Sequence, residues 1–264
     1  MEYFATCNEI PVYISDSQKG EKCIILLHGY LETLYVWSDF VKQLLPHMRV
    51  ISIDLPGHGL TGSAKEINTI EFCADVVKTV LDKCGVKESF ILGHSMGGYI
   101  AIEAVKRYPE VFCGLILMHS GPSADTPEKK LDRDREIALI RQAKLSSIAK
   151  MGIPKMFAPK NLRSMDEKIF EIIELTETHD PEGIVASVEG LKARADNLEF
   201  LKSYKKPLLM FFGTEDYHIP MEKAELLVQA LPQARTLFLA NSGHNGFLEE
   251  PLVVGEAVKT FIGV

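Results

Sequence analysis

A serine stands at the centre of the most informative stretch of the chain, Gly93-His94-Ser95-Met96-Gly97. The stretch follows an apolar run typical of a buried strand and opens a segment with helical spacing, so Ser95 is expected on a sharp strand-to-helix turn. Such a strained turn holds the hydroxyl clear of the backbone, and the helix N-terminus favours developing negative charge. Glycines at 93 and 97 allow neighbouring backbones to approach closely. The pattern predicts a nucleophilic serine.

A serine hydroxyl needs a base to take its proton, and the base needs an acid that orients it. Two later segments supply both types: Phe212-Gly-Thr-Glu-Asp216 follows one apolar run, and Ser242-Gly-His244 follows the last one. The chain order serine, acid, histidine, with each group at a strand end, is the order expected for such a turn. We predict Ser95 as nucleophile, His244 as general base and Asp216 as orienting acid.

Glu215 and His218 are the rivals of the predicted acid and base. Side chains at successive extended positions point to opposite sides, so only one of the adjacent carboxylates can face His244. Asp216 is favoured because its shorter side chain has fewer rotamers to freeze in a tight loop. His218 precedes the last predicted strand, and Pro220 with its turn disfavours an orientation towards the same side.

The proposed chemistry also needs an oxyanion hole, because attack on a carbonyl places negative charge on its oxygen. One donor is expected to be the backbone N–H of Met96, directly after the nucleophile. The second is expected in the turn that follows the early apolar run, where His28-Gly29 precedes Tyr30. We assign it to the backbone N–H of Tyr30.

Continuous apolar runs separated by helical segments must position these groups. Such runs indicate strands buried on both faces, and their alternation with helices predicts an α/β fold with a mostly parallel central sheet of about eight strands. Residues 2–14 suggest an N-terminal hairpin. The expected strands are Cys23–Leu27, Arg49–Asp54, Ser89–Gly93, Gly114–Met118, Pro207–Gly213 and Thr236–Ala240, and the expected helices are Ile70–Cys84, Met96–Arg107, Met221–Ala230 and Leu252–Phe261.

Residues 121–204 interrupt this alternation with helical patterns and no convincing buried strand. We predict a helical lid there, inserted into a core formed by residues 1–120 and 205–264. Its charged run Glu128–Glu136 is interpreted as a solvated helix face. In the core, Asn68 followed by Glu71 resembles a capping box for the first long helix.

Composition excludes several classes of protein. The 264 residues are 46% apolar and 25% charged, which is typical of a folded domain, and a net charge of −7 disfavours binding to nucleic acid or anionic membranes. Five scattered cysteines without a CxxC motif argue against disulfides and a zinc site. The first residues do not resemble a signal peptide, and the apolar runs are too short to span a membrane. We therefore expect a cytoplasmic protein.

The motifs LLHGY, DLPGHG, GHSMGG, GTED and SGHNGFLEEP, in this order, closely resemble those of the α/β-hydrolase superfamily over essentially the whole chain. Lys155–Pro159 through Ala193–Asn197 is also similar to the helical cap of small bacterial carboxylesterases and 3-oxoadipate enol-lactonases. Haloalkane dehalogenases and epoxide hydrolases of this superfamily use an aspartate nucleophile, whereas this chain has Ser95. The resemblance implies a serine hydrolase with an inserted cap.

The substrate pocket is expected between Ser95 and the predicted lid. Its candidate lining is mostly apolar, which favours a small neutral carboxylic ester or a lactone, cleaved through an acyl-enzyme without metal or organic cofactor. Among these residues, Trp37 is favoured as plain core. The candidates, besides Tyr30 and Met96, are Leu31, Trp37, Met151, Met156, Phe157, Tyr217, Ile219 and Phe247.

Three other functions use the same motifs. An enol-lactonase acting on an anionic lactone would need a lid cation such as Arg141, Lys144 or Lys155. A carbon–carbon bond hydrolase or lyase would use the same three catalytic residues. A ligand-binding receptor would retain them with slow turnover. The expected partner is a small-molecule substrate, and a homodimer is compatible with a helical lid but is not forced by the sequence.

Overall fold

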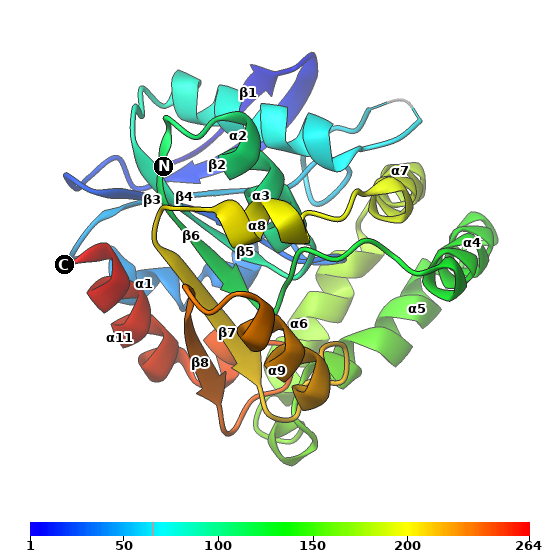
Figure 1. The fold of residues 1–264 in the computed structure, drawn as a ribbon. Helices are drawn as coiled ribbons and strands as arrows, with labels where there is room; N and C mark the ends of the chain where they lie inside the picture. Colours follow the sequence, from blue (N-terminus) through cyan, green and yellow to red (C-terminus); the bar gives the residue numbers. More distant parts are fainter. Residues whose placement is uncertain (65) are drawn as a thin grey trace.

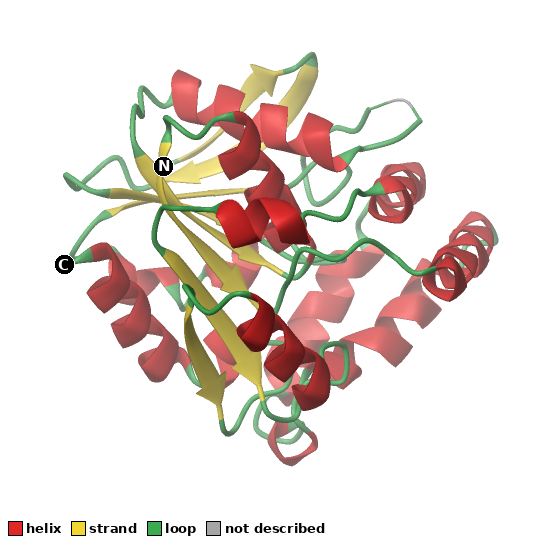
Figure 2. Cartoon of the chain, viewed as in Figure 1, coloured by secondary structure: helices red, strands yellow, loops and turns green. Residues whose placement is uncertain are grey.

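The computed structural model describes residues 1–64 and 66–264, and its centre is an eight-stranded sheet with helices on both faces (Figures 1 and 2). The strand order is β1-β2-β4-β3-β5-β6-β7-β8. The first two strands form an antiparallel hairpin, β2 is antiparallel to β4, and the remaining pairs are parallel. The strands are β1 (Glu2–Cys7), β2 (Ile10–Asp16), β3 (Cys23–Leu27), β4 (Arg49–Ile53), β5 (Ser89–His94), β6 (Phe112–Met118), β7 (Leu208–Gly213) and β8 (Arg235–Leu239).

The central strands are apolar throughout because each has helices on both sides. In β3, Ile25 and Leu27 belong to one hydrophobic cluster, whereas Ile24 and Leu26 belong to the other. The first cluster packs under α2 (Ile70–Lys83), α3 (Met96–Arg107), α8 (Leu198–Ser203) and α9 (Met221–Ala230). The second packs against η1 (Leu34–Trp37), α1 (Val41–Leu44), α10 (Gly246–Glu249) and α11 (Pro251–Ile262).

The last strand differs from the prediction of a strand buried on both faces. β8 lies at the edge of the sheet, and Phe238 in its middle is 41% exposed. A strand with one neighbour is open on its outer side, so its apolar residues are only partly covered. The apolar run was therefore correctly predicted to be a strand, but the prediction that both of its faces are buried was wrong.

The N-cap of α2 is Thr69 rather than the predicted Asn68. The Thr69 hydroxyl accepts a hydrogen bond from the Phe72 N–H at 3.0 Å. Asn68 is buried instead, where its side chain accepts from the Ala64 N–H and donates to Ser187. Sequence could not distinguish the two adjacent cap residues, because the partner of Asn68 lies more than a hundred residues away.

Helices fill the chain between β6 and β7, and most of them stand together to one side of the sheet (Figure 1). The last helix of this segment, α8, instead packs on the sheet through Leu201. Throughout residues 121–204 the structure contains no strand. The helices are α4 (Pro127–Arg141), α5 (Leu145–Gly152), η2 (Ile153–Met156), η3 (Pro159–Asn161), α6 (Asp166–Glu177), α7 (Pro181–Ala193) and α8. We call α4–α7 the inserted helices.

All five cysteines are free thiols. Cys7, Cys23 and Cys73 are buried, while Cys84 and Cys113 are half-buried. Within residues 1–64 and 66–264, no helix is both long and apolar enough to cross a lipid bilayer.

A cluster of buried histidines joins the inserted helices to the loop after β4. The ring of His58 lies 5.3 Å from those of His28 and His179, and the Gly59 N–H donates a hydrogen bond to His179 Nδ1 at 3.0 Å. His179 is 4% exposed, because α7 packs over this loop. Burial lowers the pKa of His28 and of His179 to about 4 and holds the pKa of His58 well below its usual value.

These neutral histidines make the fold sensitive to acid. The unfolded chain binds protons below a pKa of about 6.5, whereas the folded chain resists them down to about 4, so the free energy of unfolding falls as pH drops through this window. We expect His179→Asn, which keeps an acceptor for Gly59 but does not titrate, to reduce the loss between about pH 7.5 and 5 by about 1–2 kcal/mol. Urea denaturation at pH 7.5 and at pH 5 measures this loss in the free energy of unfolding. The exposed His47 gives the control His47→Asn, and an equal loss in all three proteins would contradict the assignment.

Candidate active site

Ser95 lies between the end of β5 and the start of α3, in a backbone conformation that side chains rarely adopt (φ 48°, ψ −111°). Its carbonyl accepts the Ser120 hydroxyl at 2.7 Å, and its N–H donates to the Met118 carbonyl, so the strained turn is held from β6. A Cβ on Gly93 would lie 2.3 Å from the Gly97 carbonyl oxygen. The glycine at this position is thus required by the close approach of strand and helix.

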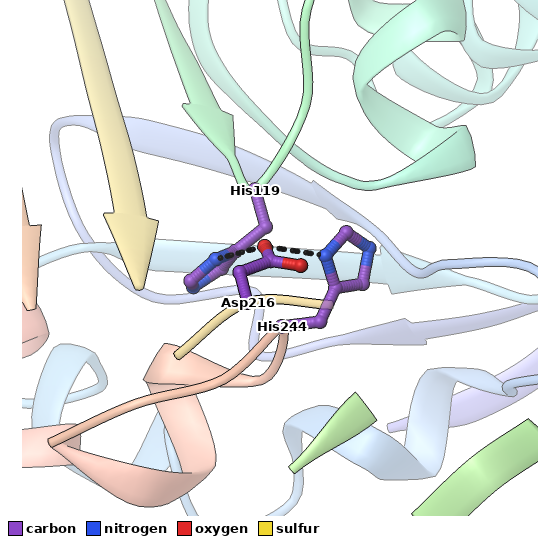
Figure 3. A group of neighbouring side chains, drawn as sticks. All are labelled: His119, Asp216 and His244. Carbon is purple, nitrogen blue, oxygen red and sulfur yellow. Dashed lines mark hydrogen bonds and ion pairs between the residues drawn. The ribbon is translucent and has the colours of Figure 1, made fainter. Parts of the chain in front are cut away.

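Three side chains from separate parts of the chain meet at this turn. His244 Nε2 lies 2.9 Å from Ser95 Oγ. On the other side of the ring, His244 Nδ1 lies 2.8 Å from Asp216 Oδ2 (Figure 3). Asp216 follows β7, and His244 lies in the loop between β8 and α10. The parallel strands end at the same edge of the sheet, which brings the three residues together. The structure therefore joins all three predicted catalytic residues in one chain of hydrogen bonds.

The Asp216 carboxylate is saturated with hydrogen bonds. Oδ1 accepts the backbone N–H groups of His218 at 2.7 Å and Ile219 at 2.9 Å. Oδ2 faces the imidazoles of His119 and His244. Burial alone would raise the pKa of Asp216, but the two histidines outweigh it and hold that pKa well below its usual value. The acid is ionised throughout the neutral range and fixed in orientation.

His119 is a second imidazole on this carboxylate, and sequence reasoning did not find that role. The Gly246 N–H donates to His119 Nε2 at 3.0 Å, so Nε2 carries no hydrogen and the proton resides on Nδ1. Nδ1 then donates to Asp216 Oδ2 at 3.2 Å (Figure 3). His119 is fully buried beneath the site. The sequence offered one signal for this contact: His119 directly follows the strand β6, and β6 is the neighbour of β7, which precedes Asp216.

His94 holds the base from the other side. Its Nδ1 lies 2.9 Å from Glu32 Oε2 and its Nε2 lies 2.8 Å from the His244 carbonyl oxygen. Both partners are acceptors, so both ring nitrogens donate and the imidazole is cationic. Burial opposes that charge, but the paired Glu32 raises the pKa of His94 above its usual value. His94 thus points away from the Ser95 hydroxyl.

The rivals of the acid and the base make other contacts. Glu215 forms an ion pair with Lys160 at 2.7 Å, on the outer side of the loop. Contrary to the expectation from Pro220, His218 faces the cavity, and its ring lies 4.9 Å from that of His244 at a tilt of 57°. The hydrogen bond to Ser95 is nevertheless made by His244. Geometry thus favours Asp216 and His244 over Glu215 and His218.

His119, Asp216 and His244 also form a group of side chains whose ligand atoms lie close enough to hold a metal ion, within 4.8 Å of one another. Their hydrogen bonds already account for this arrangement, because each imidazole has its Nδ1 towards the carboxylate. We assign no metal to the cluster.

A cavity of about 550 Å³ opens beside Ser95 and His244. Both predicted oxyanion donors, Tyr30 and Met96, are part of its wall. Met156 also anchors the base, because its carbonyl accepts the His244 N–H at 2.6 Å. The predicted lining residues that the structure places in the cavity wall are Tyr30, Leu31, Met96, Met156, Tyr217 and Ile219.

Four predicted lining residues are not in the cavity wall. Trp37 and Phe247 stack on each other with ring centroids 4.2 Å apart and, like Phe157, are buried in the second hydrophobic cluster. Met151 is 69% exposed on the solvent side of α5. Hydrophobicity alone could not separate these residues from the pocket, because core and pocket walls use the same side chains.

The cavity wall contains charged residues that sequence reasoning assigned to solvent. Lys129, Arg133 and Glu136 lie on one face of α4, at the i, i+4 and i+7 spacing, and this face borders the cavity. The interpretation of Glu128–Glu136 as a solvated face is therefore wrong for Arg133 and Glu136, which are half-buried, whereas Lys129 is exposed and also borders the cavity. The other charged lining residues are Asp125, Arg194 and Lys223, and the cations that we had considered for an anionic lactone, Arg141, Lys144 and Lys155, are not in the wall.

Similar proteins are known. A pimeloyl-[acyl-carrier protein] methyl ester esterase of Yersinia pseudotuberculosis is 26% identical, with 98% of this chain and 96% of that protein covered. The structure superposes with a TM-score of 0.93 on a thermophilic esterase of Thermogutta terrifontis, which is 26% identical and matched over 99% of this chain and 98% of the other. The enol-lactonase of Burkholderia xenovorans LB400 shares the fold at 23% identity, with a TM-score of 0.90 and coverage of 99% and 100%.

The family model described as "alpha/beta hydrolase fold" matches residues 22–251. This range contains β3 through the start of α11, together with Ser95, Asp216 and His244. It confirms the resemblance seen in the sequence motifs. The chain belongs to the α/β hydrolase fold family.

Proposed function

We propose that this protein is a serine hydrolase that cleaves small carboxylic esters or lactones. The observation that carries the proposal is the chain of hydrogen bonds from Ser95 Oγ through His244 to Asp216, at the wall of a cavity large enough for a small substrate. A hydroxyl, a base and a fixed carboxylate in this geometry are the parts that acyl transfer requires.

The proposed reaction proceeds through an acyl-enzyme. His244 Nε2 takes the proton of Ser95 as Oγ attacks the substrate carbonyl, and the Asp216 carboxylate stabilises the imidazolium that forms. The backbone N–H groups of Tyr30 and Met96 donate to the oxyanion of the tetrahedral intermediate. His244 then protonates the leaving oxygen, and the acyl group stays on Ser95. Water, deprotonated by His244, attacks the acyl-enzyme and releases the acid.

The similar proteins support an ester substrate. Two relatives at 26% identity are named as esterases, and each matches nearly the full length of the chain. The inserted helices border the cavity through α4 and α5, which fits a lid over the site.

Five free thiols and the lack of a membrane-spanning helix among the described residues fit the cytoplasm as the location of the protein.

A panel of p-nitrophenyl esters of rising acyl length, run beside γ- and δ-lactones, tests the proposal. We expect a burst of p-nitrophenol with one equivalent per active site for short esters, followed by steady turnover. Cleavage of a carbon–carbon bond in a 1,3-diketone without ester turnover would instead favour a carbon–carbon bond hydrolase. Tight binding of an ester without product would favour a receptor. Either result would overturn the proposal.

A further inference from the structure

The cavity wall has the opposite charge to the molecule as a whole. The chain carries a net charge of −7, yet four cationic side chains and only two carboxylates line the cavity. Charges along a cavity wall with low-dielectric surroundings focus the electrostatic potential inside it. An excess of cations at this place therefore attracts an anion that the remaining surface of the protein repels.

Arg133 is the cation best placed to bind that anion. Its side chain is 13% exposed, and it is held in place by Asp125, which accepts from Nε at 3.2 Å, and by Glu136, which accepts from Nη1 at 3.4 Å. No hydrogen bond from Nη2 is found among residues 1–64 and 66–264, and the residue lines the cavity. Hydrogen bonds through Nε and Nη1 thus fix the guanidinium, and Nη2 is free to donate to a ligand.

The other three cations of the cavity wall differ from Arg133 in their contacts and exposure. Arg194 uses all its nitrogens: Nε donates to the Ser123 carbonyl, Nη1 to the Leu191 carbonyl, and Nη2 pairs with Asp125 at 2.8 Å. Lys129 and Lys223 are exposed, and in the part of the chain that the structure describes neither forms an ion pair. Arg194 is a structural cation, whereas the two lysines add unpaired positive charge to the cavity wall.

We propose that the substrate is an ester or lactone that carries a second, ionised carboxylate, bound by Arg133 with Lys129 and Lys223 adding to the local positive potential. This proposal rests on the proposed function and specifies its substrate class. The free Nη2 of a fixed guanidinium can donate a charge-assisted hydrogen bond to a carboxylate, which is stronger than a hydrogen bond between neutral groups. Arg133 and its two carboxylate partners are already ordered, so little further ordering is needed when the ligand binds.

Matched pairs of substrates test this class. The monomethyl esters of succinic, glutaric and adipic acids are each compared with the methyl ester of the corresponding monoamide, which has nearly the same size but no charge. Methanol release gives kcat/KM for both members of a pair. We expect a preference for the acid at one chain length at least, which weakens as salt screens the charges. Equal kcat/KM values within all three pairs would overturn the proposal.

Arg133→Met keeps the aliphatic stem and removes the charge. We expect it to lower the acid-to-amide ratio of kcat/KM by about 10–100-fold, the range of a charged hydrogen bond. Arg141→Met is the matched control, because Arg141 ends the same helix, is 58% exposed and is not in the cavity wall. It should leave the ratio unchanged. An equal fall for acid and amide in Arg133→Met would mean that Arg133 serves packing alone, and it would refute the proposal.

Two further measurements keep the test independent of folding and turnover. If Arg133→Met does not fold, Lys129→Met combined with Lys223→Met changes two exposed positions and should lower the same ratio by about threefold or more. Calorimetry of Ser95→Ala with monomethyl glutarate and with dimethyl glutarate measures binding alone. Preferential binding of the anion without turnover by the unmodified protein would reject the hydrolase and retain the anion site. Equal binding would reject the anion site while leaving ester hydrolysis intact.

Discussion

Replacing Ser95 with alanine should lower kcat for short esters by about 10⁵–10⁶-fold, as expected when the nucleophile of a serine hydrolase is removed. The loss follows because His244 Nε2, 2.9 Å from Ser95 Oγ in the unmodified protein, has no other hydroxyl to activate there. Steady-state hydrolysis of p-nitrophenyl acetate measures the change. The thermal midpoint should change little, because the variant removes one oxygen from a half-buried position.

Covalent labelling provides the control for this variant. A serine-directed phosphonate should modify the unmodified protein at Ser95, with one label per chain found by peptide mass spectrometry. Ser95→Ala should remain unlabelled under the same conditions. If the label persists in Ser95→Ala, or if the variant retains a tenth of the activity, another residue is the nucleophile.

Asp216→Asn should lower kcat by about 10³–10⁴-fold, whereas Glu215→Gln should cost less than about tenfold. Asp216 Oδ2 accepts from both His119 and His244, and an amide in its place cannot stabilise the imidazolium and favours the wrong tautomer of the base. Glu215 pairs with Lys160 on the outer side of the loop and does not contact the base. Parallel kinetics of the two variants measure the difference.

The pair of variants is matched, because the two carboxylates are adjacent and each loses one charge. A second comparison, His244→Ala with His218→Ala, applies the same logic to the base. We expect measurable turnover to remain in His218→Ala and to disappear in His244→Ala. A greater loss in Glu215→Gln than in Asp216→Asn would show that the acid is misassigned by one position.

The hydrogen bonds around Asp216 fix the orientation of its carboxylate and of His244. Two imidazoles share Oδ2, and two backbone N–H groups bind Oδ1. A carboxylate held by four donors cannot rotate to follow the base, so His244 is kept in the orientation that faces Ser95. The ion pair of His94 with Glu32 fixes the same loop from beneath through the His244 carbonyl. The site is therefore ordered before a substrate binds, which is the condition for electrostatic stabilisation.

The sequence by itself determined the strands, the chain order of the three proposed catalytic residues and the turn that carries Ser95. These features are local: continuous apolar runs indicate strands with both faces covered, and glycines at 93 and 97 are readable because the close approach they permit leaves no room for a side chain. The ends of parallel strands share one edge of the sheet. Three residues at such ends could therefore be predicted to meet without knowledge of any long-range contact.

Only the tertiary structure decided which side chains face the cavity. A charged residue of α4 has the same sequence pattern whether it faces solvent or the cavity, and an apolar residue has the same pattern in the core and in a pocket wall. The rotation of each helix decides between these positions, and it is set by packing against distant partners. Arg133 was therefore predicted to be solvated, and Phe157 and Phe247 were predicted to line the pocket. The contacts of His119 and His179 could not be predicted because they are long-range. Their hydrogen bonds to Asp216 and to Gly59 join segments about a hundred residues apart, and no local pattern records a contact of that kind.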